Sequence, residues 1–326
     1  MTNKSLSEII QPIEAELKQF NELFKQSLKS KVALVDLITR YLLKQKGKKI
    51  RPLLVLLSSD ICGGITERSY RGAKLVELLH TATLVHDDVV DNAETRRGFP
   101  SINSVWKNKI AVLMGDYLLS RGLMLAVDGN DFDFLRVITN TVKRMSEGEL
   151  LQISKTRKLD NDEETYFKII SDKTASLLST CCEVGARAST DDDEKIKTMQ
   201  EFGENLGIAF QIRDDILDYI GAKKIIGKPL GGDIKEKKIT LPLIYSLKQA
   251  PKDESRKIIG SIKRGAKKVD INEVIQFARK YDGINYAEKV AADYANKALN
   301  NLKAFNNSKS RSALESLVSF VVERKN

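Results

Sequence analysis

The sequence predicts an all-α fold in which one domain packs its helices around a central cavity or core. Proline is scarce, with six residues in 326, and only 6% of the residues are aromatic. Alanine, leucine, isoleucine, lysine and glutamate, which favour helix over sheet, are plentiful. Apolar residues recur with the helical period along most of the chain, and no stretch shows a clear strand alternation.

The expected helices follow one another with only short turns between them. Turn signals fall at CGG (62–64), DGND (128–131), TDDD (190–193) and GKPLGGD (227–233). Neither a linker nor a low-complexity segment divides the chain, so we expect a single domain over residues 1–326. The helices are expected at roughly 5–29, 32–45, 50–62, 66–92, 103–128, 131–157, 162–189, 191–221 and 238–249, with several shorter ones to the end.

Composition narrows the class of protein. With 42% hydrophobic residues, the chain can bury a sizeable core. No apolar run reaches the ~20 residues of a membrane span, and the polar N-terminus lacks an apolar signal core. We therefore expect a cytoplasmic protein without an integral membrane segment. Cys62, Cys181 and Cys182 are too few for a disulfide framework and are not spaced as a zinc site, so they are expected to be core thiols.

The net charge of +10 is compatible with nucleic acid, an anionic membrane or a small polyanionic substrate. Much of the positive charge follows residue 220, in KKIIGK, KEKK and KRGAKK. These runs lack the interleaved aromatic residues that stack bases. We expect them to be solvated helix faces or loops, with no nucleic-acid partner.

Three aspartates end an otherwise apolar helical segment, from Leu75 to Val90. A segment that is apolar nearly all round is typical of a helix enclosed by others. Asp87 and Asp91 lie one turn apart on the same face, and Asp88 lies ~100° round from Asp87. Buried carboxylates without partners would cost many kcal/mol or become protonated. Carboxylates at this D-D-x-x-D spacing suit Mg²⁺, which often adds water and substrate phosphate oxygens.

The same spacing recurs in QIRDDILDY at 211–219, with Asp214, Asp215 and Asp218 in another mostly apolar helix. Two buried acidic helix ends are hard to tolerate in one small domain unless they face each other across a shared metal cluster. The alternative is two separate sets of salt bridges to lysine and arginine.

The chain resembles the trans-isoprenyl diphosphate synthase (polyprenyl synthetase) family in many ordered motifs. The resemblance implies an isoprenoid-synthase-type fold, an orthogonal helix bundle around a deep central cavity, and a homodimer. The motifs are GKKIRP (47–52), LLHTATLVHDDVVDNAETRRGFPS (78–101), LMGDYLL (113–119), MSEGELLQ (145–152), DKTASLL (172–178), FQIRDDILD (210–218) and GKPLGGDIKEKKITLPLI (227–244).

The resemblance also implies a reaction. An allylic diphosphate bound through Mg²⁺ loses its diphosphate, and isopentenyl diphosphate attacks the resulting cation head to tail, so that the product grows by one isoprene. Three Mg²⁺ ions per site are implied, with Mn²⁺ able to replace them, and the aspartates act as ligands rather than bases. The implied metal ligands are Asp87, Asp88, Asp91, Asp214, Asp215 and Asp218; the implied catalytic set is Asp87, Asp88, Asp91, Asp214, Asp215 and Lys173.

Two diphosphates in a pocket of low dielectric need cationic donors beyond the metals. By match to the family, one set would bind isopentenyl diphosphate and another the allylic diphosphate. The first set is Lys48, Arg51, His80 and Arg97; the second is Arg96, Lys173, Thr174, Gln211, Lys228 and Lys238.

Each basic residue has a plainer interpretation. His80 lies two turns before Asp87 on nearly the same face, but a histidine there could also be a core residue satisfied by a neighbour. Lys228 and Lys238 are expected on a flap over the site, with an ordinary surface loop as the alternative. The family pattern is also imperfect, because Lys46 replaces a glycine, and Gly232 with Asp233 replaces an Asn-Asp pair.

Product length is expected to depend on the residues below the first aspartate. In the family, bulky aromatic residues at the positions of Ala82 and Thr83 end chain growth at a short length. Both residues are small here. Ala82 lies only ~7.5 Å below Asp87, so the cavity floor is expected deeper, with Leu119, Leu123 or Met124 as candidates. We expect a product longer than farnesyl, of the size of quinone side chains.

Other functions remain open at this point. A farnesyl or geranylgeranyl diphosphate synthase would use the same site to make a short product. A class I terpene cyclase or a squalene-type condensing enzyme would need the aspartates but not an isopentenyl diphosphate site. A non-catalytic subunit of a heteromeric synthase would be expected to have lost an aspartate or an arginine, and none is missing here.

Overall fold

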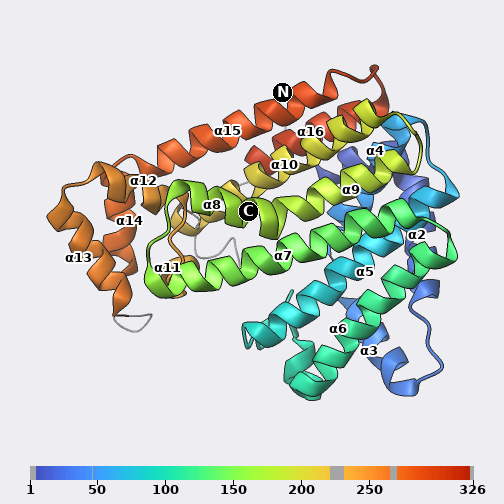
Figure 1. The fold of residues 1–326 in the computed structure, drawn as a ribbon, viewed down its shortest axis with the longest axis horizontal. Coiled ribbons are helices and arrows are strands. Elements are labelled where there is room, and N and C mark those ends of the chain that lie inside the picture. Colours follow the sequence, from blue (N-terminus) through green and yellow to red (C-terminus); the bar gives the residue numbers. More distant parts are fainter. Residues whose placement is uncertain (1–4, 46, 221–230, 265–269, 324–326) are drawn as a thin grey trace.

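The computed structural model describes residues 5–45, 47–220, 231–264 and 270–323, and it confirms the all-α class (Figure 1). The N-terminal half contains α1 (Leu6–Ile10), α2 (Glu14–Ser27), α3 (Ala33–Lys44), α4 (Ile50–Cys62), α5 (Glu67–Val90), α6 (Ile102–Asp128) and α7 (Phe132–Lys158). The C-terminal half contains α8 (Glu163–Ile170), α9 (Ser176–Arg187), α10 (Asp193–Ile220), α11 (Gly232–Lys235), α12 (Leu241–Gln249), α13 (Lys252–Lys263), α14 (Ile271–Lys280), α15 (Gly283–Leu302) and α16 (Lys309–Glu323).

Two expected helices contain a turn of another helical type, and in a third, α6, Lys107 has a non-helical φ of 71°. The helix expected at 5–29 divides at a 3-10 turn, Gln11–Ile13, where Pro12 lacks the backbone N–H that would continue the helical hydrogen bonds. The helix expected at 162–189 contains a π turn, Ser171–Ala175, that joins α8 to α9 without breaking the helical backbone. Periodicity predicted the extent of both segments but could not show these local changes of hydrogen bonding.

A short hairpin follows α5, although no strand was expected from the sequence. β1 (Thr95–Arg96) pairs antiparallel with β2 (Phe99–Pro100). The two turn residues, Arg97 and Gly98, both have positive φ, as the tightest hairpin turns require. Two-residue strands are too short to produce an alternating pattern, which is why the sequence did not predict them.

Side-chain caps define where several helices begin. Thr66 and Ser69 form a reciprocal capping box at the start of α5, and the Ser101 hydroxyl accepts a hydrogen bond from the Ser104 N–H at the start of α6. Asp162 caps α8 in the same way. These caps satisfy backbone N–H groups that have no partner within the helix.

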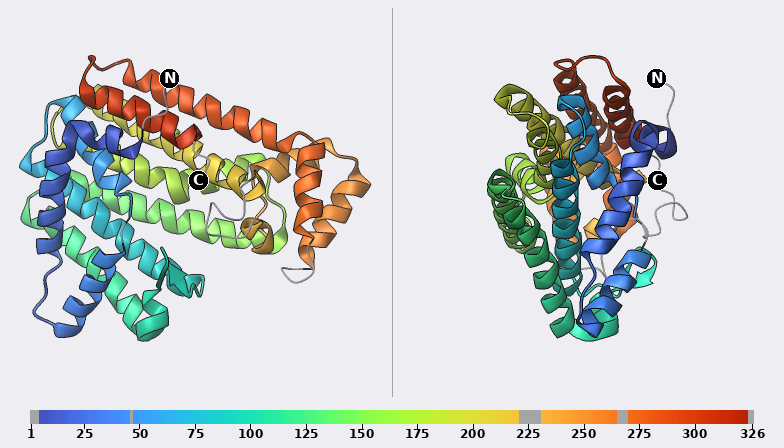
Figure 2. Two further views of the ribbon diagram at one scale, coloured as in Figure 1. Left: turned by 180° about the vertical axis from the view of Figure 1, so that it is seen from behind. Right: turned by 90° about the vertical axis from the view of Figure 1, so that its right-hand side faces the viewer.

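The long helices pack along one another and enclose α5. α5 packs against α6 on one side and against α4 and α9 on others, while α10 packs between α9 and α15. The views in Figures 1 and 2 place α15 and α16 at one side of the molecule and α6 with α3 at the opposite side. The buried apolar side chains form two clusters, a larger one around α4, α5 and α9 and a smaller one around α8, α12 and the C-terminal part of α10.

α6 has one apolar side that the chain leaves exposed. Val112, Leu113, Met124 and Val127 are each more than 40% exposed and lie within one arc of the helix. α6 is also the one helix of the described residues whose length and composition would allow it to cross a membrane, with 33% of its apolar window buried. The expectation of no integral membrane segment is therefore not confirmed by this structure.

Close helix contacts depend on glycine at particular positions. A Cβ atom on Gly185 of α9 would lie 2.3 Å from the carbonyl oxygen of Val55 on α4. Nearby, the buried Ser59 hydroxyl lies 2.9 Å from the carbonyl oxygen of Gly185 and 2.7 Å from the hydroxyl of Ser189. These contacts fix how closely α4 and α9 approach, and α5 packs against both of these helices.

We expect Gly185→Ala to lower the free energy of unfolding by about 2 kcal/mol, because overpacking against a backbone carbonyl outweighs the gain in helix propensity. Gly260→Ala on α13 is the matched control, since a Cβ atom there meets nothing within 4 Å. This control should raise the free energy of unfolding by up to about 1 kcal/mol. Urea denaturation followed by circular dichroism measures both, and equal stabilisation by the two substitutions would contradict the packing argument.

Candidate active site

The first aspartate motif lies at the C-terminal end of α5, where its three carboxylates have different surroundings. Asp88 is buried, and its Oδ1 accepts a hydrogen bond of 2.8 Å from Arg96 Nε. Asp87 is half-buried, and Asp91, directly after the helix, is exposed. Of the three, Asp88 is therefore neutralised by an arginine from the hairpin. Asp87 and Asp91 do not take part in this ion pair.

The second motif lies near the C-terminal end of α10 and is held by neutral donors. Asp215 is only 4% exposed; its Oδ2 accepts a hydrogen bond of 2.7 Å from the Tyr166 hydroxyl, and its Oδ1 accepts one of 2.8 Å from Gln211 Nε2. Asp218 accepts hydrogen bonds from the N–H groups of Gly232 (2.9 Å) and Asp233 (3.1 Å). Separate salt bridges to lysine or arginine therefore do not explain Asp215 and Asp218.

Gly232 and Asp233 replace an Asn-Asp pair of the family pattern. In the structure, the backbone N–H groups of both residues donate hydrogen bonds to Asp218. These donors do not depend on which side chains the two residues carry. The departure from the family pattern therefore leaves Asp218 supported. Asp214 is exposed on the same helix.

Burial raises the pKa of three of these carboxyl groups. For Asp215 burial has the largest effect, followed by the nearby Asp233, and its pKa lies well above the ordinary value. Burial also raises the pKa of Asp87 to about 6, against the opposing effect of Lys173, and raises that of Asp218. A carboxyl pKa that burial raises means that the ionised form lacks the stabilisation it would have in water. A bound cation would supply that stabilisation.

The donor set fits magnesium. Within the described residues, no three histidine, cysteine, aspartate or glutamate side chains already lie together as a closed metal cage. Mg²⁺ is commonly held by one or two carboxylates together with water and substrate phosphates, so an open arrangement of oxygen donors suits it. Asp87, Asp91, Asp215 and Asp218 would hold such ions.

Two lysines connect the motifs electrostatically. The Lys173 ammonium forms an ion pair with Glu149 on α7 and lowers the pKa of Asp87 on α5. The Lys238 ammonium lies 2.6 Å from Glu236 Oε2. Asp233 and Asp91 also help to raise the pKa of Lys238. Since Asp91 follows α5 and Asp233 adjoins the α10 motif, the two acidic helix ends face a common region.

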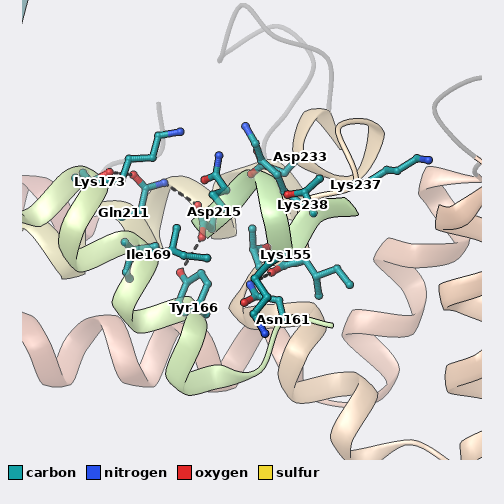
Figure 3. Close-up of a pocket in the computed structure, with 16 residues that line it drawn as sticks. Lys155, Asn161, Tyr166, Ile169, Lys173, Gln211, Asp215, Asp233, Lys237 and Lys238 are labelled. Carbon is teal, nitrogen blue, oxygen red and sulfur yellow. Dashed lines mark hydrogen bonds between the residues drawn. The ribbon is translucent and has the colours of Figure 1, made fainter. Parts of the chain in front are cut away.

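This region contains a cavity, here called the Asp215 pocket (Figure 3). Figure 3 shows Asp215 between Gln211 and Tyr166, with Lys173 on one side of it and Asp233 and Lys238 on the other. Thr174 also lines the pocket, and its hydroxyl donates a hydrogen bond of 2.9 Å to Gln211 Oε1. The structure therefore brings together Lys173, Thr174, Gln211, Asp215 and Lys238, as expected for one diphosphate site. Lys228 lies outside the described residues.

A second cavity, the His80 pocket, lies on the other side of the α5 terminus. Its polar end contains His80, Glu77, Lys49, Arg96 and Arg97. Gln45, Thr81 and Asp88 also line the cavity, and its apolar lining consists of Phe24, Leu28, Leu42, Leu43, Leu78, Leu84, Val85, Ile102 and Leu118. Asp88 and Arg96 line this pocket rather than the Asp215 pocket, so Arg96 is placed with the proposed isopentenyl diphosphate residues and not with the allylic set.

His80 lies in this pocket as a neutral side chain. It is 8% exposed, and its pKa lies well below the ordinary value because of burial and, next, the charges of Arg51, Arg97 and Arg96. A neutral imidazole can donate one hydrogen bond to an anion without adding charge. The pocket position favours a binding role for His80 over that of a core histidine.

The GKKIRP segment meets the hairpin at this pocket. Arg97 lies so close to Gly47 that a Cβ atom there would be 2.5 Å from the Arg97 guanidinium. Lys48, the expected ligand, is exposed, and its ammonium lies 5.5 Å from the Phe320 ring centroid instead. The neighbouring Lys49 lines the pocket. The Lys49 ammonium donates a hydrogen bond to Asn21 Oδ1, and Lys48 does not line the pocket.

Arg51 adds an unsatisfied donor beside this pocket. Its Nε is buried and has no hydrogen-bond partner among the described residues, and burial lowers its pKa. Glu77 is close enough to oppose that effect. Buried polar atoms are rarely left unpaired in proteins, so an anionic ligand oxygen is the natural partner of this donor.

Several residues near the site were missed from the sequence. Tyr166 contacts Asp215, and Glu77 and Lys49 line the His80 pocket. Glu77 had a detectable signal, since it is an acid one turn before His80 in an apolar helix. Tyr166 had none, because nothing local connects it to a carboxylate 49 residues later.

The expected chain-length residues lie within α5. Ala82 is 1% exposed and Thr83 is half-buried, and neither lines either pocket. Among the candidate floor residues, Leu119 and Leu123 pack on the main core, but Met124 is 47% exposed. Met124 therefore does not close a cavity within this chain.

Known proteins match nearly the whole chain. A geranylgeranyl diphosphate synthase of Saccharolobus solfataricus is 35% identical, with 98% of this chain and 97% of that protein aligned. A nonaprenyl diphosphate synthase of Rhodobacter capsulatus, specific for geranyl diphosphate, is 34% identical over 97% of each chain. The solved structure of a polyprenyl synthase from Caulobacter crescentus, complexed with calcium and isoprenyl diphosphate, has a TM-score of 0.90 at 32% identity over 100% of both chains.

The family model for polyprenyl synthetase matches residues 32–278, which include both aspartate motifs, the hairpin and the GKKIRP segment. Together with the geometry of the two pockets, these matches confirm the resemblance seen in the sequence. The chain belongs to the polyprenyl synthetase family and is a prenyl-transferring enzyme.

Proposed function

We propose that the enzyme elongates an allylic diphosphate by head-to-tail condensation with isopentenyl diphosphate and releases an all-trans polyprenyl diphosphate longer than farnesyl. One observation carries this proposal. Consecutive residues at the end of α5 serve two cavities: Asp88 lines the His80 pocket, whereas Asp87 interacts with Lys173 of the Asp215 pocket. Two diphosphates could thus lie on either side of one helix end, which is what a two-substrate condensation requires.

The Asp215 pocket is the proposed site of the allylic diphosphate. Mg²⁺, when bound by Asp87, Asp91, Asp215 and Asp218, supplies positive charge that stabilises the departing diphosphate. Lys173 and Lys238 add charge-assisted hydrogen bonds, and Gln211 adds a neutral donor. The C1–O bond breaks with its electron pair going to the diphosphate, and the aspartates remain ionised ligands rather than proton acceptors.

The His80 pocket is the proposed site of isopentenyl diphosphate. Arg97, Lys49 and His80 would bind its diphosphate without metal, and the unpaired Nε of Arg51 would gain a partner. The double bond of isopentenyl diphosphate attacks C1 of the allylic group, and the released diphosphate accepts the proton that the new chain then loses. The apolar wall of the pocket keeps water from the cation.

Two small residues of α5 bear on the length of the product. Relatives of this chain range from a geranylgeranyl to a nonaprenyl diphosphate synthase, so family membership leaves the length open. Ala82 and Thr83 lie on α5 five and four residues before Asp87, and neither side chain is large enough to stop a growing chain. We propose that growth passes this level and gives chains of the size of quinone side chains.

The exposed side of α6 supports a homodimer. Leu113 is 56% exposed and Met124 47%, on the same side as Val112 and Val127. A contiguous apolar patch of this kind commonly marks a protein interface. We propose that a second copy of the chain covers it, with each α6 packed against the other, because most soluble oligomers are symmetric dimers.

The reaction can be tested with radiolabelled isopentenyl diphosphate, farnesyl diphosphate and Mg²⁺. We expect labelled linear products longer than farnesyl, and removal of Mg²⁺ with EDTA should stop their formation. Asp215→Asn should lower kcat roughly 100-fold or more, because it removes a negative ligand from the metal site. Asp253→Asn, on the exposed first turn of α13, is the matched control and should retain activity. Cyclic hydrocarbon from farnesyl diphosphate alone would instead identify a terpene cyclase.

We expect Ala82→Phe to shorten the product, since a ring at this level blocks chain growth below the reacting carbons. Thin-layer or liquid chromatography of the dephosphorylated products measures the length distribution. The initial rate of isopentenyl diphosphate consumption is the internal control, because the first condensations need no space below Ala82. An unchanged distribution in a folded variant would place the growing chain elsewhere.

We expect Leu113→Arg to convert the homodimer to a monomer, because a buried, unpaired arginine would oppose the proposed interface. Size-exclusion chromatography with light scattering measures the mass of the assembly. Ser312→Arg adds the same charge at an exposed position of α16, on the opposite side of the molecule, and should leave the mass unchanged. A wild-type protein that is monomeric at micromolar concentration would contradict the dimer.

A further inference from the structure

The segment that carries Lys173 and Thr174 is not a regular α-helix. A π turn, Ser171–Ala175, lies between α8 and α9, and the residues on both sides keep right-handed helical dihedral angles. π turns are rare and have poorer hydrogen-bond geometry than an α-helix, so one persists only where its surroundings hold it. This turn supplies Lys173 and Thr174 to the Asp215 pocket.

One side of the π turn is held by charged groups from two other helices. Arg144 of α7 donates hydrogen bonds to Asp172 Oδ1 (2.8 Å), the Ser171 hydroxyl (2.9 Å) and Glu204 Oε1 (2.9 Å). Glu204 of α10 in turn accepts a hydrogen bond from the Ser171 hydroxyl. The guanidinium of Arg144 thus links α7 and α10 to the first two residues of the turn.

The same two helices approach the turn through glycine. A Cβ atom on Gly148 of α7 would lie 3.0 Å from Asp172 Cβ and 3.1 Å from Lys173 N. A Cβ atom on Gly207 of α10 would lie 2.5 Å from Ala175 Cα. Gly148 follows Arg144 by four residues and Gly207 follows Glu204 by three, so each helix contributes one charged contact and one close contact to the turn.

The next two residues of the turn point toward the site. The Lys173 ammonium pairs with Glu149 and influences Asp87. The Thr174 hydroxyl donates to Gln211 Oε1, and Gln211 Nε2 donates to Asp215 Oδ1. Ser171 and Asp172 therefore contact Arg144 or Glu204, whereas Lys173 and Thr174 face the substrate pocket. Movement at the first pair would move the second.

We propose that Arg144 and Glu204 are positioning residues for prenyl transfer: by holding Ser171 and Asp172, they fix the π turn so that Lys173 and Thr174 meet the allylic diphosphate. This inference rests on the proposed function of the Asp215 pocket. Neither Arg144 nor Glu204 lines that pocket. Their effect on catalysis therefore passes through the turn.

The chemistry of Arg144 makes the proposal specific. Its planar fork donates to three side chains in different directions, which a lysine ammonium on a flexible stem does not reproduce. Arg144 is 29% exposed and Asp172 9%, so the group is only partly screened by solvent. Arg144→Lys should therefore fail to restore what Arg144→Met loses, although it keeps the charge.

Steady-state kinetics with both substrates varied tests the proposal. For Arg144→Met and Arg144→Lys we expect KM for the allylic diphosphate to rise roughly tenfold and kcat to fall roughly tenfold, because small displacements of positioning groups are costly. KM for isopentenyl diphosphate should stay within about twofold, since the His80 pocket does not touch the turn. Arg187→Met is the matched control: it removes a comparable arginine–glutamate pair on α9, with Glu183, and should leave both KM values unchanged.

Gly148→Ala gives an independent test if Arg144→Met does not fold. An added methyl group would press on Asp172 and Lys173 without removing any ion pair, and the same selective rise in KM is expected. In variants shown to be folded by circular dichroism, equal rises in KM for both substrates, or no rise in either, would overturn the proposal. The wild-type enzyme is assayed in parallel, and its failure to elongate the allylic substrate would reject the proposed function itself.

Discussion

The burial of carboxylates at the ends of α5 and α10 is the constraint on which the rest of the structure depends. Burial raises the pKa of Asp87, Asp215 and Asp218, and neutral donors hold Asp215. Lys173 and Lys238, two of the lysines that line the Asp215 pocket, are themselves paired with Glu149 and Glu236. A ligand that combines divalent cations with a diphosphate satisfies the aspartates and the lysines together, which neither component could do alone.

The end of α5 divides this electrostatic problem into two. Asp88 is neutralised by Arg96 and faces the His80 pocket, where positive side chains are in excess. Asp87 instead interacts with Lys173 of the Asp215 pocket, whose lining carries two aspartates as well as lysines. We propose that the His80 pocket binds a diphosphate directly and that the Asp215 pocket binds one through metal. The same helix end would keep the two substrates adjacent.

Helix periodicity and the repeated aspartate spacing allowed much of this enzyme to be predicted from the sequence. Periodicity and spacing predicted the extents of α4, α5, α6, α7 and α10 and the two motifs. The resemblance to the family implied that Lys173, Thr174, Gln211 and Lys238 lie together. Three features were not expected. Lys49 rather than Lys48 lines the His80 pocket, which depends on the backbone of the segment before α4. The strands of the hairpin are too short to show an alternating pattern. Tyr166 contacts Asp215, which lies 49 residues later in the sequence.

The sequence by itself determined which segments are helical, which helix faces are apolar, and that two acidic helix ends lie in one chain, because these properties follow from local spacing. Only the tertiary structure decided how the helices are rotated and how closely they approach, since these depend on contacts between distant residues. Gly148 and Gly207 set the distance to the π turn, and Arg144 and Glu204 hold it. The direction of each catalytic side chain is fixed by such contacts, which no single helix contains.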